Sequence, residues 1–269
     1  MSDRDDTGDF ILFTLLKQET YKLLKRPSFT IFWLFLIVFQ LAMAIFGKVY
    51  PQTFQPENLF LNDFYAPVMI VFYIIAVGST QLSSENQYGT LKALLYRQYS
   101  SSKVLVSKWL TLLGCALCFY GSSLVMTFLL KVIFFQNKFS LTLQVSTHQP
   151  IWQAMLMNAV SEFLTLLFLA AFVLLLATLF DNSTPAIIVG ISAYFVVSVF
   201  NQLMFMLIDQ HDWLKWNPVN MLNFGAQLNS PKLSSLTHLG IDQMMIGYIA
   251  YGSIFLILGL IVFRRRNLR

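Results

Sequence analysis

Six apolar runs, each long enough to cross the hydrocarbon core of a bilayer, constrain this chain more than any other feature. A transmembrane helix needs roughly 20 apolar residues, and its backbone polar groups are satisfied within the helix itself. The runs cover residues 28–47, 66–82, 109–135, 155–180, 185–207 and 244–263. Only 12% of the residues are charged, whereas an ordinary soluble domain has roughly 25%. We therefore predict one all-α integral membrane domain over residues 1–269, with six transmembrane helices.

The segment before the first run predicts an amphipathic helix over residues 10–26 that lies on the membrane surface. Residues at three- and four-residue spacing form one face: Phe13, Leu16, Thr20, Leu23 and Leu24. The other face is polar and basic: Lys17, Gln18, Lys22, Lys25 and Arg26. We expect these cations to face anionic lipid headgroups of the inner leaflet. Pro27 should end the helix, and residues 1–9 read as a mobile polar tail.

The basic residues predict the orientation of the chain. With both termini in the cytoplasm, 13 of the 18 Lys and Arg residues lie on the inner side, as the positive-inside rule requires. The other five fall outside or near outer ends of spans: Lys48, Lys131, Lys138, Lys215 and Lys232. The net charge of +5 is therefore explained by orientation in lipid, and we expect no nucleic-acid partner. Residues 83–108 become a cytoplasmic loop, and residues 208–243 an outer segment.

The polar loop 83–108 carries local helix signals. Ser84 followed by Gln87 has the form of a capping box, which predicts a short helix from Glu85 to about Tyr96. The serines at 100–102 should cap the helix that enters the third span. Local pattern alone is equally compatible with a solvated loop that only joins two spans.

Residues 85–91 of this loop read Glu-Asn-Gln-Tyr-Gly-Thr-Leu, and they are followed by Leu94-Leu95, a serine cluster with Lys103, and Ser107-Lys108. With these residues the loop resembles the first cytoplasmic loop of ATP-binding-cassette (ABC) type-2 permeases. The resemblance extends over nearly the whole chain, including the amphipathic first helix, the six spans and the very short link after the fourth. Relatives often have a proline just before the serine cluster, where this chain has Gln98 and Tyr99. In that family the loop is a coupling helix that docks on an ATPase. The resemblance gives this role to Glu85, Asn86, Gln87, Tyr88, Gly89, Thr90 and Leu91.

The same resemblance implies a function for the whole chain. It would be the multi-pass permease subunit of an ABC transporter in a bacterial cell (plasma) membrane, exporting a hydrophobic or amphipathic peptide, lipid or drug-like molecule. Its partners would be a second permease chain, identical or homologous, and two copies of the ABC ATPase. The sequence has no G-x-x-x-x-G-K-[S/T] phosphate loop. We therefore expect no catalysis and no cofactor in this chain, with ATP and Mg bound by the partner ATPase.

Two charged residues inside apolar runs are candidates for a pathway or gate, because such residues are costly in lipid and commonly functional. Glu162 and Lys131 should both lie toward the outer leaflet, where an ion pair between them is plausible. Snorkelling of Lys131 and a structural hydrogen bond of Glu162 are the alternatives. The family resemblance adds Tyr73, Phe195 and Asn201 as lining candidates between the second and fifth spans of two subunits.

The sequence is also compatible with other functions. An ion-coupled secondary transporter would need buried carboxylates near the midplane, and Glu162 is the one candidate. A membrane immunity or sensor protein without its own transport is a further alternative, whereas no motif favours an intramembrane enzyme. We expect Cys115 and Cys118 to be packing residues, and the three histidines are too scattered for a metal site. In the related family, segments like 208–243 often fold into short helices that dip into the outer leaflet, and an ordinary loop is the alternative.

Overall fold

The computed structural model describes residues 3–87, 100–144, 149–180 and 182–267, and those ranges are helical without a β-strand. Five of the helices are long and apolar enough to cross a membrane, and a sixth, α8, also passes if its two halves, which meet at 54°, are counted as one span. The chain is therefore an all-α integral membrane protein, as predicted. The six helices are α2 (Pro27–Val49), α4 (Ala66–Gln87), α6 (Ser101–Phe134), α7 (Ile151–Leu179), α8 (Ser183–Gln210) and α12 (Ile241–Asn267).

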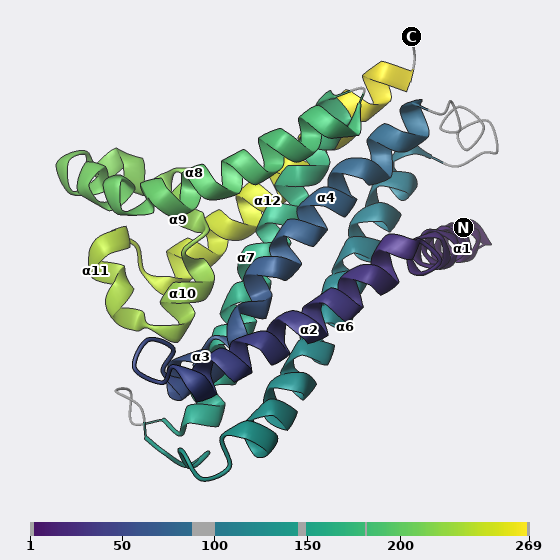
Figure 1. Cartoon of the computed structure of the whole chain (residues 1–269). Helices are drawn as coiled ribbons and strands as arrows, with labels where there is room; N and C mark the ends of the chain where they lie inside the picture. The colour runs from purple at the N-terminus through teal and green to yellow at the C-terminus, as the bar shows by residue number, and fades with distance from the viewer. Residues whose placement is uncertain (1–2, 88–99, 145–148, 181, 268–269) are drawn as a thin grey trace.

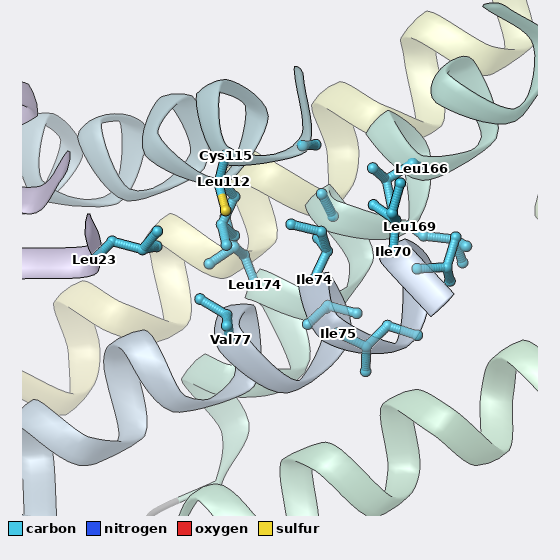
Figure 2. Close-up of a cluster of buried hydrophobic side chains, with 14 of the residues drawn as sticks. Leu23, Ile70, Ile74, Ile75, Val77, Leu112, Cys115, Leu166, Leu169 and Leu174 are labelled. Carbon is cyan, nitrogen blue, oxygen red and sulfur yellow. The ribbon is translucent and has the colours of Figure 1, made fainter. Parts of the chain in front are cut away.

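The spans are centred on three helices. Figure 1 shows α4, α6 and α7 running side by side, with α2 along one side of them and α8 and α12 on the other. Buried side chains of α4, α6 and α7 meet in one apolar cluster, where Ile74, Leu112 and Leu169 face one another and Leu23 reaches in from α1 (Figure 2). Both termini lie toward the end of the bundle where α4 ends, and the short helix α3 (Pro56–Leu61) lies at the opposite end (Figure 1).

The N-terminal helix α1 (Asp3–Leu24) starts earlier than the sequence predicts and also contacts the bundle. The expected mobile tail is helical from Asp3. The buried stripe is Leu15, Glu19 and Leu23, which are spaced by four residues and share one face. Phe13, assigned to the apolar face, is 66% exposed. Phe13 and Leu24 of the predicted apolar face remain available to lipid, and α1 packs on α6 through a face that contains Glu19, an acidic residue that a pattern of apolar residues does not identify.

The first outer connection is more ordered than the predicted loop. It contains α3 and then a single turn, η1 (Asp63–Tyr65), in which all three residues have positive φ angles of 51°, 49° and 60°. Left-handed backbone costs roughly 1–2 kcal/mol for each residue with a Cβ atom. Full burial of Phe64 (0% exposed) against α2, α3 and α6 residues holds the turn in this conformation.

The predicted capping box is wrong. Helix α4 continues without a break to Gln87, so Ser84 and Glu85 lie inside a helix and Ser84 does not begin one. No Gly or Pro interrupts residues 80–87, and a helix that has already formed extends more easily than a new one nucleates. By contrast, Ser100 caps α6 as predicted, since its hydroxyl accepts a hydrogen bond from the backbone N–H of Lys103 at 3.4 Å.

The outer segment folds into short helices instead of an ordinary loop. Its elements are η2 (Asp212–Trp216), α9 (Pro218–Met221), α10 (Phe224–Asn229), η3 (Pro231–Leu233) and α11 (Ser234–Thr237). Phe224 packs on Tyr248 of α12 with ring centroids 5.0 Å apart, and the Tyr248 hydroxyl donates to the Leu164 carbonyl of α7 at 2.6 Å. The segment is thereby fixed to both of these spans.

Candidate functional site

A cavity of about 330 Å³ lies where the first outer connection, the first half of α7 and the outer segment meet. We call it the outer cavity, after the side on which the orientation predicted from the basic residues would put it. Its volume is within the range of small-molecule sites, roughly 300–1,000 Å³. It is lined by Leu61, Asn62, Asp63, Tyr65, Pro67, Val68, Asn158, Ala159, Ser161, Glu162, Ala226, Asn229, Ser230 and Leu233. Polar and apolar side chains thus share the wall, and the site can accept a ligand of mixed character.

Close backbone packing and side-chain amides hold the walls together. Gly225 of α10 lies directly against α7, and a Cβ atom added there would overlap the backbone carbonyl of Ser161. Asn158 donates to the Leu61 carbonyl at 3.0 Å, and its own side-chain oxygen accepts a hydrogen bond from Asn229. The three segments are therefore connected through Asn158, which lies in the cavity wall.

Asp63 lies in the cavity wall and also belongs to a buried hydrogen-bond network. It is 2% exposed, and its carboxylate accepts hydrogen bonds from the hydroxyls of Ser123 and Thr127 on α6. The Gln40 amide of α2 donates to the same carboxylate at 3.3 Å. The sequence reading missed Asp63, although polar residues within the apolar runs 28–47 and 109–135 could have indicated a polar partner between those spans.

The two charged residues singled out from the sequence lie in different environments. Glu162 lines the outer cavity. The Lys131 ammonium lies over the ring of Phe139 at 5.6 Å from its centroid, and the residue is 8% exposed. No ion pair joins Lys131 to Glu162, both of which belong to the described part of the chain. That predicted pair is wrong in this structure, because the Lys131 charge is placed on an aromatic face instead.

The remaining pathway candidates do not gather at one site within a single chain. Tyr73 packs inside the core, stacked on Phe32 with ring centroids 4.2 Å apart. Phe195 is 52% exposed on α8 and contacts Phe72. Asn201 exchanges two amide hydrogen bonds with Asn223, at 2.8 and 3.0 Å, which join α8 to the outer segment.

A second polar cluster lies near the opposite end of the bundle. The Lys108 ammonium donates to a Glu19 carboxylate oxygen at 2.8 Å and to the Gln81 carbonyl at 3.3 Å. Lys22 donates to the other Glu19 oxygen at 2.8 Å. Burial raises the pKa of Glu19, but the attraction of Lys108 and the hydrogen bonds from both lysines outweigh it, so the pKa lies below its ordinary value. The Lys108–Glu19 pair therefore connects α1, α4 and α6.

The coupling residues inferred from family resemblance flank this cluster. Glu85, Asn86 and Gln87 are helical and lie at the end of the described part of α4, one turn along the helix from Gln81. Tyr88, Gly89, Thr90 and Leu91 lie outside the described residues, as do Gln98 and Tyr99. Among the described residues, no group of three or more His, Cys, Asp or Glu side chains could hold a metal ion.

These features define a multi-pass membrane protein with a cavity at the end of the bundle that contains α3. The chain belongs to the family described as "Protein of unknown function (DUF2705)", whose model matches residues 33–269. It is also similar to a protein of Bacillus subtilis (strain 168) described as "Uncharacterized membrane protein YdbK". The two are 27% identical over 190 residues, which cover 68% of this chain and 74% of the relative. The description of that relative agrees with the membrane class derived from the fold.

Proposed function

We propose that this chain is the membrane-spanning permease subunit of an ABC transporter in the plasma membrane, and that it exports a hydrophobic or amphipathic substrate. A separate ATPase, in two copies, would bind ATP and Mg and hydrolyse the ATP. The permease itself would act without catalysis, paired with a second identical or homologous permease chain. In this proposal the termini and residues 83–108 face the cytoplasm, because 13 of the 18 Lys and Arg residues then lie inside.

The Lys108–Glu19 pair is the observation that carries the proposal. Residues 83–108 are bounded by α4 and α6, and Lys108 connects the start of α6 to α1 and to the Gln81 carbonyl of α4. A force applied to this segment by a docked ATPase would therefore reach three helices at once. A loop that merely joined two spans would not need a buried ion pair at its base, where two desolvated charges are costly to place.

The exposed apolar surface of α8 supports a dimer of permease chains. Phe195, Val199 and Leu203 follow one another at four-residue spacing and are 52%, 68% and 47% exposed. Such an apolar surface can face lipid, or it can pack against a second permease chain. In the dimer, Phe195 would line the pathway between subunits, as the family resemblance implies.

Purification from the natural host tests the proposal. We expect the tagged full chain, extracted in mild detergent, to co-purify with a protein that carries a phosphate-binding loop and whose ATP hydrolysis responds to the permease. Glu85→Ala and Gly89→Trp should abolish co-purification or the response. Lys138→Ala removes an exposed charge from the opposite end of the bundle and serves as the matched control.

Three results would contradict the proposal: ATP hydrolysis by the purified chain alone, no co-purifying ATPase, or wild-type behaviour of both coupling variants. A second candidate, an ion-coupled secondary transporter, is favoured by one observation, since the structure adds Asp63 to Glu162 as a carboxylate in the outer cavity. Transport into or out of vesicles that is driven by an imposed ion gradient without ATP would support that candidate over the first.

A further inference from the structure

The charged residues that line the outer cavity determine which charge a bound molecule can carry. Asp63 and Glu162 are acidic, and the residues that line the cavity include no Lys, Arg or His. An anionic ligand would meet the Glu162 carboxylate, with the buried Asp63 carboxylate behind the wall and no compensating cation in the lining, whereas a cationic ligand would supply the missing charge. Glu162 makes no ion pair with any described residue.

The neutral residues of the wall favour a ligand with an apolar body. Leu61, Val68 and Leu233 contribute hydrocarbon, and Tyr65 and Pro67 contribute ring faces. Oxygen atoms of Asn62, Ser161 and Ser230 can accept hydrogen bonds from an ammonium or guanidinium group. The cavity thus combines an acidic patch with apolar walls, and its volume of about 330 Å³ suits the end group of a larger molecule or a small molecule as a whole.

We propose that the outer cavity binds the positively charged end of a cationic amphipathic molecule, with Glu162 as the main counter-charge. Asp63 lies in the same wall but does not contact the ligand, because its carboxylate is buried and held by hydrogen bonds from Ser123, Thr127 and Gln40. The inference rests on the proposed function for its claim that this molecule is the transported substrate. The binding step itself requires only this chain.

Two probes of the same shape and opposite charge test the inference. The full chain is reconstituted in nanodiscs of zwitterionic lipid and titrated calorimetrically with tetraphenylphosphonium or tetraphenylborate, with empty nanodiscs subtracted. Both ions keep their charge at all working pH values, and the signal from empty nanodiscs removes the stronger partition of the borate into lipid. We expect saturable binding of the phosphonium and none of the borate. Equal binding of the two ions, or binding of the borate alone, would overturn the inference.

Site-directed variants then locate the binding. Glu162→Gln should weaken phosphonium binding by about two- to fivefold, because Glu162 is exposed and water screens part of its charge. Glu57→Gln is the matched control, because it removes the same charge from an exposed position on α3 outside the cavity lining, and it should bind like the wild type. Ala226→Leu adds bulk to the lining without changing charge and should also weaken binding. Wild-type affinity in both Glu162→Gln and Ala226→Leu would exclude this cavity.

The cationic end could belong to a bilayer lipid or to a molecule taken from water. Repeating the titration in nanodiscs that contain a lipid with a cationic amino headgroup distinguishes these sources, since a bound lipid would compete with the phosphonium and lower its apparent affinity. The result is also independent of the ATPase. If binding is charge-selective but no ATPase co-purifies, the cation site in the cavity is supported and the ABC transporter proposal is contradicted. If ATP hydrolysis is coupled to the chain but binding is not charge-selective, the ABC transporter proposal is supported and the cation site is contradicted.

Discussion

The Lys108 ammonium is buried at the junction of three helices, and its role can be tested one residue at a time. The residue is 0% exposed, and its partner Glu19 is 6% exposed. A buried charge is tolerated only with a partner and hydrogen bonds, which here come from Glu19 and the Gln81 carbonyl. Lys22 pairs with the same carboxylate, but its side chain is 50% exposed, so water screens much of that interaction.

Lys108→Met should destabilise the protein by about 3 kcal/mol, because Glu19 stays buried and loses its buried counter-charge, while Lys22 is half exposed. Thermal unfolding of the full chain in nanodiscs, followed by tryptophan fluorescence, measures the effect. The double variant Glu19→Leu/Lys108→Met should recover most of the loss, since apolar residues can replace a buried pair at little cost.

Lys22→Met is the control for that experiment and should change stability by less than about 1 kcal/mol. If Lys108→Met unfolds at the wild-type temperature, or if the double variant is no more stable than the single one, the pair does not hold the three helices together.

At the scale of elements, α10 is positioned by a close approach to α7. Gly225 lies where a Cβ atom would meet the Ser161 backbone, and backbone cannot rotate away as a flexible side chain can. Ser161 and Glu162 both line the outer cavity. The distance between α10 and α7 therefore determines both the packing of the outer segment and the width of the cavity.

Gly225→Ala should destabilise the protein by about 1–3 kcal/mol, the usual cost of forcing extra atoms into a packed contact, and should alter phosphonium binding. Gly252→Ala in α12 is the matched control, because nothing lies within 4 Å of the added Cβ atom there. Alanine is the better helix former, so this control should be neutral or slightly stabilising. Thermal unfolding and the same titration compare the two variants. Identical behaviour would show that α10 can move away from α7 without consequence.

At the scale of the whole molecule, the orientation in the membrane is the prediction on which the functional proposal depends. The native cysteines, Cys115 and Cys118, are first replaced by alanine. Lys25 and Lys138 are both exposed, and a single cysteine is placed at one or the other. A membrane-impermeant maleimide should label Lys138→Cys in intact cells. Lys25→Cys should be labelled only after the cells are permeabilised, because Lys25 follows α1 on the proposed cytoplasmic side. The reverse pattern would place the termini and residues 83–108 outside and exclude docking of a cytoplasmic ATPase.

The spans were predictable from the sequence, but the junctions between them were not. Apolar runs identify a transmembrane helix because lipid requires both a minimum length and an internally hydrogen-bonded backbone. The end of α4 was mispredicted at Ser84, since a local capping signal competes with the extension of a helix that already exists. The burial of Glu19 on α1 was not predictable from local pattern, because its partner Lys108 lies 89 positions away in the sequence.

In the candidate site too, one residue was predictable from the sequence and another was not. Glu162 could be identified from the sequence alone, because a carboxylate within an apolar run is costly and therefore informative. Asp63 could not, since it stands between two runs where an acidic residue is ordinary, and only the packing of α2 and α6 around it makes it a buried group.

The helical membrane class follows from the amino-acid sequence, because lipid acts on each apolar run separately and each run can be recognised from its own composition. The tertiary structure alone decided that Glu162 lies in a cavity with Asp63 and without Lys131, and that Lys108 connects α1 to α4 and α6. These are contacts between residues far apart in the chain, and their partners depend on how the helices pack against one another.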